Sequence, residues 1–249
     1  FAAGADQATA DLSLPPELRN RVTRFEIAGI RSAGAVSLTD DSLKRRKVAL
    51  ISGVPQDREA LQLLSPTHYL RQALEPVADL IDGSLEDVLL ANPDVIVLAD
   101  VARMTQVETD GVLDWLDKGG LLLRFAGPRL AASDIDRMEE DPLMPVRLRE
   151  GGRTVGGAMS WGEPKALAPF PEGSPFLGLS VPDEVTVTAQ VLAQPDPDLP
   201  ARTIAALADG TPLVTRKDVG QGQVVLVHVT ANAEWSNLPL SGLFVQMLE

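Results

Sequence analysis

The chain has 249 residues, with 22 lysines and arginines against 35 aspartates and glutamates, so its formal net charge is −13. Apolar residues make up 45% and charged residues 23%, a balance that is ordinary for a globular protein and excludes a disordered or fibrous chain. The acidic charge argues against a nucleic-acid-binding protein, because such proteins neutralise phosphates with lysine and arginine. The absence of cysteine excludes disulfides, thiolate metal sites and cysteine nucleophiles.

The N-terminal part is predicted to be separate from the rest. Residues 1–20 show weak periodicity, which is typical of a linker. Residues 24–38 alternate between apolar and polar side chains, and the glycines in this stretch mark the turn of a predicted β-hairpin. We therefore divide the chain into an N-terminal arm and hairpin over residues 1–45 and an α/β domain over residues 46–249.

From residue 48 onward, strands and helices are predicted to alternate. Short apolar runs indicate strands that are covered on both faces, and the segments between them have helical periodicity. This alternation is typical of a mostly parallel sheet with helices on both sides, in a doubly wound, flavodoxin-like layout. The predicted strands cover residues 48–52, 78–81, 95–99 and 121–125, and the predicted helices cover residues 57–74, 84–91 and 105–118.

Several polar residues are predicted to begin helices. Ser65 is expected to restart the first helix after an interruption, since serine can accept backbone N–H groups and Pro66 loses no hydrogen bond at the next position. Ser84 and Thr105 each precede an acidic residue three positions later, as in a capping box. Ser133 is expected to cap a further short helix.

After about residue 142 the chain becomes rich in predicted strands and loops. Residues 185–191 alternate strictly, which predicts one half-buried strand, and the glycines between residues 151 and 157 are expected to form turns. We expect a β-rich C-terminal part with an insertion around residues 150–220. The other predicted strands cover residues 203–208, 213–217 and 224–229, the last two joined by a glycine-rich turn at residues 218–222.

The two ends of the chain indicate a segment of a longer polypeptide. The first residue is Phe1, and the last residues carry an apolar stripe of helical spacing with no stop signal after it. No apolar run approaches the ~20 residues that a membrane span needs, so we expect the segment itself to be soluble. The stripe consists of Leu240, Leu243, Phe244, Met247 and Leu248.

The carboxyl ends of the predicted strands are the candidate binding site, because ligands bind there in open α/β sheets. That rule selects Ser52, Asp100, Gly127, His228 and Asn232. Asp100 could act as a base or metal ligand, although a carboxylate that caps the following turn is the favoured interpretation. For His228, a hydrogen-bonded core histidine is favoured over a catalytic one.

Two tryptophans in polar loops are further candidates for ligand binding. Trp161, beside Ser160, and Trp235 lie in segments rich in glycine, serine or asparagine, and aromatic side chains on loops often bind ligands. Packing of each loop onto the core is an equally good explanation. No residue spacing typical of a metal site or a phosphate-binding loop occurs, so we expect no metal and no other cofactor.

The order of elements over residues 48–128 is similar to the class I glutamine amidotransferase-like fold. The stretches at residues 119–128, 156–161 and 220–242 resemble the extracytoplasmic segment of large, uncharacterised bacterial membrane proteins with an N-terminal BatA-like double transmembrane region. This resemblance covers essentially the whole chain. It implies a periplasmic or extracytoplasmic location, flanking transmembrane helices in the full-length protein, and an unknown small molecule or envelope protein as partner.

The resemblance also implies a test of activity. Active amidotransferases of this class carry cysteine on a sharp elbow after a strand, followed later by histidine and glutamate. Here the matching segment, residues 125–128, reads Phe-Ala-Gly-Pro and offers no nucleophile, and Pro128 has no N–H for an oxyanion hole. His228 lies near the position of the family's histidine, but Glu234 follows six residues later rather than two.

The leading hypothesis is therefore a non-catalytic binding or scaffolding module of a membrane-anchored bacterial envelope protein. The alternative is a small-molecule or carbohydrate-related hydrolase that uses Asp100 and His228, as trehalose-utilisation-like relatives of the fold suggest. An assembly domain with a large apolar surface patch is a third option. The first two differ geometrically, because the hydrolase needs both residues in one solvent-open pocket.

Overall fold

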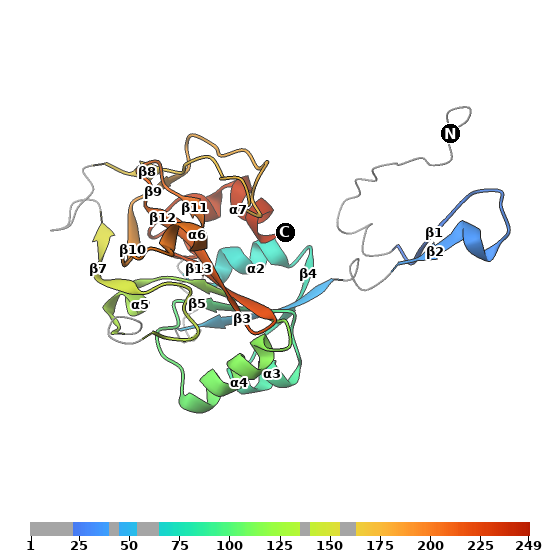
Figure 1. Ribbon diagram of the computed structural model, residues 1–249, viewed down its shortest axis with the longest axis horizontal. Coiled ribbons are helices and arrows are strands. Elements are labelled where there is room, and N and C mark those ends of the chain that lie inside the picture. Colours follow the sequence, from blue (N-terminus) through green and yellow to red (C-terminus); the bar gives the residue numbers. More distant parts are fainter. Residues whose placement is uncertain (1–21, 40–44, 54–64, 135–139, 155–162) are drawn as a thin grey trace. The chain divides into compact units, whose positions relative to one another are not determined.

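The computed structural model describes residues 22–39, 45–53, 65–134, 140–154 and 163–249, and it divides the chain into two units, 1–45 and 46–249 (Figure 1). In the first unit, β1 (Arg24–Glu26) pairs antiparallel with β2 (Val36–Leu38), and the 3-10 turn η1 (Ala33–Ala35) lies between them. The N-terminal β-hairpin predicted from the alternation is thus confirmed.

The second unit is a mixed α/β structure built on a seven-stranded, mostly parallel sheet. The order across the sheet is β11-β12-β13-β6-β5-β3-β4, in which the five strands from β13 to β4 are parallel and β12 and β11 are antiparallel. The strands are β3 (Arg46–Ser52), β4 (Ala78–Ile81), β5 (Val95–Ala99), β6 (Leu121–Phe125), β11 (Thr203–Ala206), β12 (Pro212–Val219) and β13 (Gly222–Val227).

Helices cover both faces of this sheet, and the side chains of β3 show why. Val48 and Leu50 point into a first hydrophobic cluster with α2 (His68–Leu74) and α7 (Gly242–Leu248). Ala49 and Ile51, which alternate with them along the strand, point into a second cluster with α3 (Leu85–Leu90) and α4 (Gln106–Leu116) on the opposite face. A strand covered on both faces must be apolar at every position, which explains the continuous apolar run.

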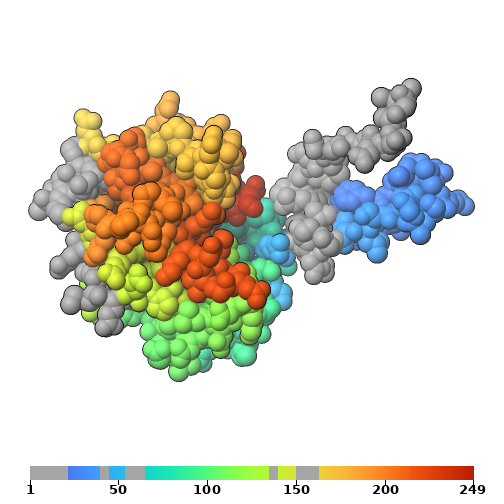
Figure 2. Space-filling model, viewed as in Figure 1, coloured from blue at the N-terminus to red at the C-terminus, as the bar shows by residue number. Residues whose placement is uncertain are grey.

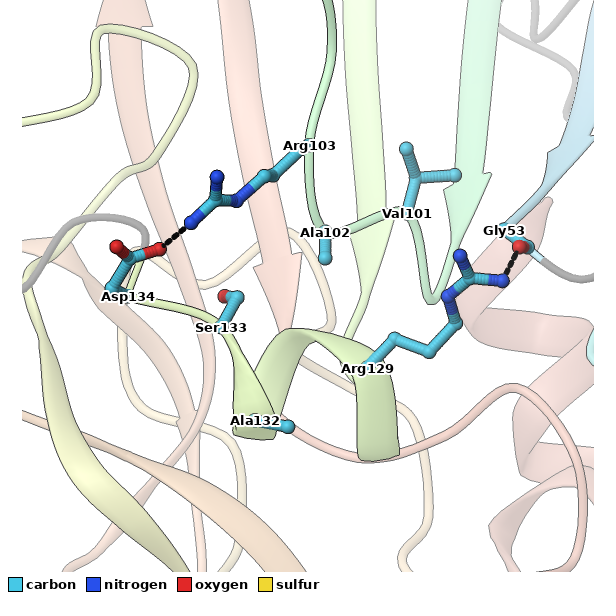
Figure 3. A pocket seen from close by; sticks show the side chains of 8 residues that line it. All are labelled: Gly53, Val101, Ala102, Arg103, Arg129, Ala132, Ser133 and Asp134. Atoms are coloured by element: carbon cyan, nitrogen blue, oxygen red, sulfur yellow. Dashed lines mark hydrogen bonds and ion pairs between the residues drawn. The ribbon is translucent and has the colours of Figure 1, made fainter.

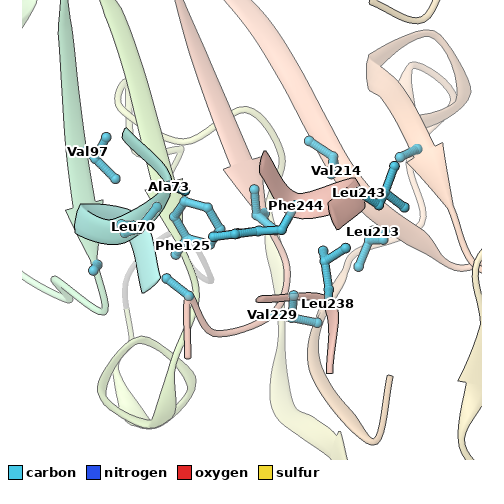
Figure 4. Close-up of a cluster of buried hydrophobic side chains, with 14 of the residues drawn as sticks. Leu70, Ala73, Val97, Phe125, Leu213, Val214, Val229, Leu238, Leu243 and Phe244 are labelled. Carbon is cyan, nitrogen blue, oxygen red and sulfur yellow. The ribbon is translucent and has the colours of Figure 1, made fainter. Parts of the chain in front are cut away.

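The first cluster is the larger part of the core (Figure 4). Phe125 at the end of β6 meets Phe244 of α7 edge to face, with ring centroids 6.1 Å apart. Leu70 of α2 is completely buried, and burial of one leucine side chain contributes about 2 kcal/mol to folding. The predicted C-terminal helix is confirmed as α7, although Leu240 lies in the preceding 3-10 turn η4 (Leu238–Leu240) and is 61% exposed.

Two of the predicted helix starts are confirmed. Thr105 forms a complete capping box: its hydroxyl accepts the Glu108 N–H at 3.2 Å, and the Glu108 carboxylate accepts the Thr105 N–H at 2.7 Å. Ser84 accepts the Asp87 N–H at 3.2 Å, but the Asp87 carboxylate accepts the Ser84 hydroxyl rather than a backbone group. Aspartate is one carbon shorter than glutamate, so half of the box is missing.

The helix predicted to restart at Ser65 begins later. The Ser65 hydroxyl accepts the Thr67 N–H at 3.4 Å, as expected, but α2 begins only at His68 with Thr67 as its N-cap, and the His68 N–H donates to the Ser65 carbonyl at 3.2 Å in a turn. The earlier part of that predicted helix, residues 57–64, lies outside the described residues. The helix predicted after Ser133 also falls largely outside them, and Ser133 instead ends an unpredicted helix, α5 (Pro128–Ala132).

The prediction of one strand over residues 185–191 is wrong. The segment divides into β9 (Thr186–Val187), which pairs with β8 (Lys165–Ala166), and β10 (Ala189–Ala193), which pairs with β7 (Leu148–Thr154). The chain changes partner at Thr188 because the N–H groups of Thr188 and Ala189 both donate to the carbonyl of Trp235. Residues 189–192 are buried, so this part is not half-exposed.

One further expectation for the C-terminal part needs correction, because the glycines at 151 and 152 lie within β7 rather than in turns. The strands β7 to β10 form two-stranded sheets outside the central sheet, whereas β11 and β12 belong to it, and the short helix α6 (Leu199–Arg202) leads into β11. The predicted turn between β12 and β13 is confirmed at Gly220, which has φ +59° and packs against Asp117 at the end of α4. Figure 2 shows the orange surface of this C-terminal part next to the green surface of the segment that contains α4.

Candidate functional site

The carboxyl ends of β3, β5 and β6 lie side by side. Ser52 is opposite Ala99, and Ala99 is opposite Phe125. Backbone hydrogen bonds extend this alignment beyond the strands, because the Gly53 N–H donates to the Ala99 carbonyl and the Asp100 N–H donates to the Phe125 carbonyl, both at 3.0 Å. These contacts bring Ser52, Asp100 and Gly127, three of the predicted candidates, to one edge of the sheet.

Asp100 caps the helix α5 from a different strand. Its side chain is buried, and its carboxylate accepts the N–H of Arg129 at 3.1 and 3.2 Å and the N–H of Leu130 at 3.0 Å. The helix has no cap of its own, since Gly127 at the N-cap has no side chain. The sequence pattern favoured a carboxylate that caps the turn directly after Asp100. The structure shows that Asp100 instead caps α5, the helix that follows the next strand.

The backbone around Asp100 is closely packed. Asp100 has φ +54°, a left-handed conformation that is uncommon outside glycine. A Cβ atom at Gly127 would lie 2.3 Å from the Asp100 Cγ, and one at Gly53 would lie 2.1 Å from the Asp100 carbonyl oxygen. Both positions therefore require glycine, and the Asp100 carboxylate fills the space at the elbow of residues 125–128.

Burial raises the pKa of the Asp100 carboxyl group above its ordinary value. The hydrogen bonds from the Leu130 and Arg129 amides, together with the positive charge of Arg129, oppose this rise only in part. The carboxylate form is thus stabilised by backbone amides and destabilised by poor solvation, and the loss of solvation is the larger effect on the pKa.

A hollow of about 620 Å³ opens beside this cap (Figure 3). Arg103, in the loop after β5, forms an ion pair with Asp134 across one side of the hollow. Arg129, on α5, donates from its guanidinium to the Gly53 carbonyl on the other side. The lining residues are Gly53, Val101, Ala102, Arg103, Arg129, Ala132, Ser133 and Asp134.

Sequence reasoning did not identify the arginines of this region. Arg124 of β6 is only 1% exposed, and its guanidinium donates to the carbonyls of Val101 at 2.8 Å and Leu143 at 3.0 Å. It thereby holds the start of the loop that carries Arg103. Arg129 directly follows Gly127 and Pro128, which come after the strand β6. This Gly-Pro pair was the local signal in the sequence that could have placed Arg129 at the edge of the sheet.

His228 lies inside the protein rather than in the hollow. The ring is fully buried; Nδ1 is 3.0 Å from the Val191 carbonyl and Nε2 is 3.0 Å from the Thr215 hydroxyl. A carbonyl oxygen can only accept, so Nδ1 carries the proton and Nε2 accepts from Thr215. Burial lowers the pKa of His228 to about 4, partly offset by the bond to Val191, so the ring is neutral near pH 7.

The remaining predicted candidates do not converge on Asp100. Asn232 is buried, and its side-chain oxygen accepts the Glu234 N–H at 3.1 Å. Trp235 is half-buried and packs against the first cluster and a third one around Leu130 and Met144, so it holds its loop on the core. Ser160 and Trp161 lie outside the described residues. Neither Asp100 nor His228 lines the hollow.

Two features are absent from the described residues. In that part of the chain, no three histidine, aspartate or glutamate side chains are grouped closely enough to hold a metal ion. No helix within the same residues combines the length and apolar character required to cross a bilayer.

The fold resembles that of several solved structures. A β-galactosidase from Bacillus circulans sp. alkalophilus matches with a TM-score of 0.54 and 15% identity, over 82% of this chain and 30% of that one. A cytoplasmic protein from Salmonella typhimurium LT2 matches with a TM-score of 0.51 and 15% identity, over 80% of this chain and 93% of that one. A protein from Bacteroides uniformis described as ThuA-like matches with a TM-score of 0.51 and 14% identity, over 82% and 88% of the two chains.

These likenesses concern the fold alone, because the sequence identities are low. The chain spans less than a third of the β-galactosidase that it matches. No protein-family model and no curated protein matches the chain.

Proposed function

We propose that this chain is a non-catalytic, amidotransferase-like binding or scaffolding module. One observation carries the proposal: the Asp100 carboxylate already accepts the amide N–H groups of Arg129 and Leu130 at the elbow. Acyl transfer needs a nucleophile at that bend and free amide donors for the oxyanion that forms. Residues 125–128 supply no nucleophile, and the chain's own carboxylate occupies the amides next to them.

The alternative, a hydrolase that uses Asp100 and His228, has one favourable observation. A buried carboxyl group with a left-handed backbone and a raised pKa is a combination often found at functional sites. Against it, the His228 ring is fully buried and both of its nitrogens are engaged within the protein, so it cannot reach a substrate in the hollow. We therefore rank the hydrolase second.

The cellular setting is part of the proposal. The resemblance of residues 119–128, 156–161 and 220–242 to segments of membrane-anchored bacterial envelope proteins supports an extracytoplasmic module with a small molecule or an envelope protein as partner. Fractionation of cells that produce the full-length protein tests this point. Recovery in the membrane fraction, with this segment open to protease added from the periplasmic side, is the expected result.

Activity assays test the absence of catalysis. The purified chain is incubated with glutamine, a p-nitrophenyl ester and a p-nitrophenyl galactoside, beside Asp100→Asn and His228→Ala variants whose folding is checked by circular dichroism. We expect the wild-type protein and both variants to show the same background rates. A wild-type rate above background that either folded variant abolishes would favour the hydrolase instead.

A further inference from the structure

The hollow beside Asp100 is lined by an unusual set of charges for this chain. The whole protein has a net charge of −13, yet among the described residues two arginines and one aspartate line the hollow. Asp100 lies behind the wall and directs its oxygens to the amides of α5, so it does not line the hollow. In the part of the chain that the structure describes, the charged side chains that line the hollow are therefore mostly positive.

Both arginines have N–H donors to spare. A guanidinium carries several donors in a planar fork, and Arg129 directs one of its terminal nitrogens to the Gly53 carbonyl. Arg103 pairs with Asp134, but the side chains of this pair are 70% and 71% exposed. Exposed ion pairs are weak because water screens them, so another anion can replace Asp134 at little cost.

The backbone that carries the two arginines is held in place. The buried Arg124 donates to the Val101 carbonyl, two residues before Arg103. The amide N–H of Arg129 is bound to Asp100. Between the two arginines the wall includes Val101, Ser133 and the small side chains of Ala102 and Ala132 (Figure 3). A site that is anchored in this way loses less entropy when it binds a ligand.

We propose that this hollow binds a small molecule that carries an oxyanion group, a phosphate or a carboxylate, with Arg103 on one side of the ligand and Arg129 on the other. The proposal deepens the binding role proposed above and rests on it. Guanidinium groups match the geometry of both oxyanions and form charge-assisted hydrogen bonds with them. In the structure, the carboxylate of Asp134 takes the place of the ligand's oxyanion at Arg103.

Calorimetric titration at constant ionic strength tests the proposal, with inorganic phosphate, succinate and galactose as separate probes. We expect saturable binding of phosphate, succinate or both, and none of galactose. Arg103→Ala and Arg129→Ala should each weaken binding about tenfold. Asp134→Asn should strengthen it several-fold, because it removes the competing carboxylate. The matched control is Arg147→Ala, an exposed arginine outside the hollow, which should change nothing.

A second measurement covers the case in which a variant misfolds. In the wild-type protein, the Nε–Hε NMR signals of Arg103 and Arg129 should shift with the same saturation curve as the heat of binding in the calorimetric titration.

Binding of phosphate but not succinate identifies a phosphate ligand, and the reverse identifies a carboxylate. The proposal is overturned if neither oxyanion saturates the protein, if the two arginine variants bind as the wild type does, or if galactose alone binds. None of these outcomes depends on turnover, which tests the absence of catalysis separately.

Discussion

Asp100 and His228 are two buried polar residues that follow strands of the same sheet, yet the structure uses them differently. Asp100 lies behind a solvent-open hollow and binds the backbone amides of a short helix. His228 is enclosed in the core and joins the Val191 carbonyl to the Thr215 hydroxyl. A position at the end of a strand therefore does not decide whether a side chain can reach a ligand; the elements packed around it do.

The same physical effect moves the two pKa values in opposite directions. Burial disfavours the charged form of either group, so it raises the pKa of the Asp100 carboxyl and lowers that of the His228 ring. Protonation removes the buried charge at Asp100 and creates one at His228. Acid should thus favour the folded state at the first site and oppose it at the second.

The largest effect is expected for Gly127→Ala. The new methyl group would lie 2.3 Å from the Asp100 Cγ, so the cap has to move, and we expect the free energy of unfolding to fall by about 3 kcal/mol in urea denaturation. The control is Gly242→Ala, where nothing lies within 4 Å of the new atom and stability should stay the same or rise slightly. Equal effects of the two substitutions would contradict the close packing at the elbow.

The next effect is a pH dependence that comes from His228. Its pKa is about 4 in the folded state and about 6.5 in the unfolded chain, so the unfolded state binds more protons between these values. Stability from this group is present above pH 6.5 and lost as the pH falls toward 4, by about 2 kcal/mol between pH 7 and pH 5. His228→Gln should remove that part of the slope. A ring that titrates near pH 6.5 by NMR would show that it is not enclosed.

Asp100→Asn should have a smaller effect, with the opposite pH dependence. The amide oxygen can still accept from α5, but its NH₂ group lacks the partners that the carboxylate has, so we expect a loss of about 1.5 kcal/mol. Because the pKa of Asp100 is raised, the wild-type protein gains stability at this site as the pH falls and the variant does not. The gap between them should widen in urea denaturation at lower pH; a gap that narrows would contradict the raised pKa.

The smallest effect is expected for Thr215→Val. The substitution preserves the shape of the side chain but leaves Nε2 of His228 without a donor, which should cost about 1 kcal/mol in thermal or urea unfolding. The same change should move the ¹⁵N shift of that nitrogen. An unchanged shift would mean that Thr215 makes no hydrogen bond to this nitrogen.

The regular elements of the second unit could be predicted because their causes are local. The apolar runs that became β3, β5 and β6 and the capping box at Thr105 depend on neighbours within a few residues. Ser65 and residues 185–191 show where that logic fails. Local preference favoured a helix cap at the first and one strand at the second, but the chain changes partner at Thr188 because of the Trp235 carbonyl, far along the sequence.

The amino-acid sequence by itself determined the parallel sheet, the chain's acidic charge, and an elbow without a nucleophile, since each follows from composition or from short-range pattern. Only the tertiary structure decided that Asp100 caps α5, that Arg124 holds the loop of Arg103, and that His228 is enclosed. Each of these contacts joins residues about 20 or more positions apart. Such contacts form only when the strands align, and that alignment is set by packing of the whole core rather than by any one segment.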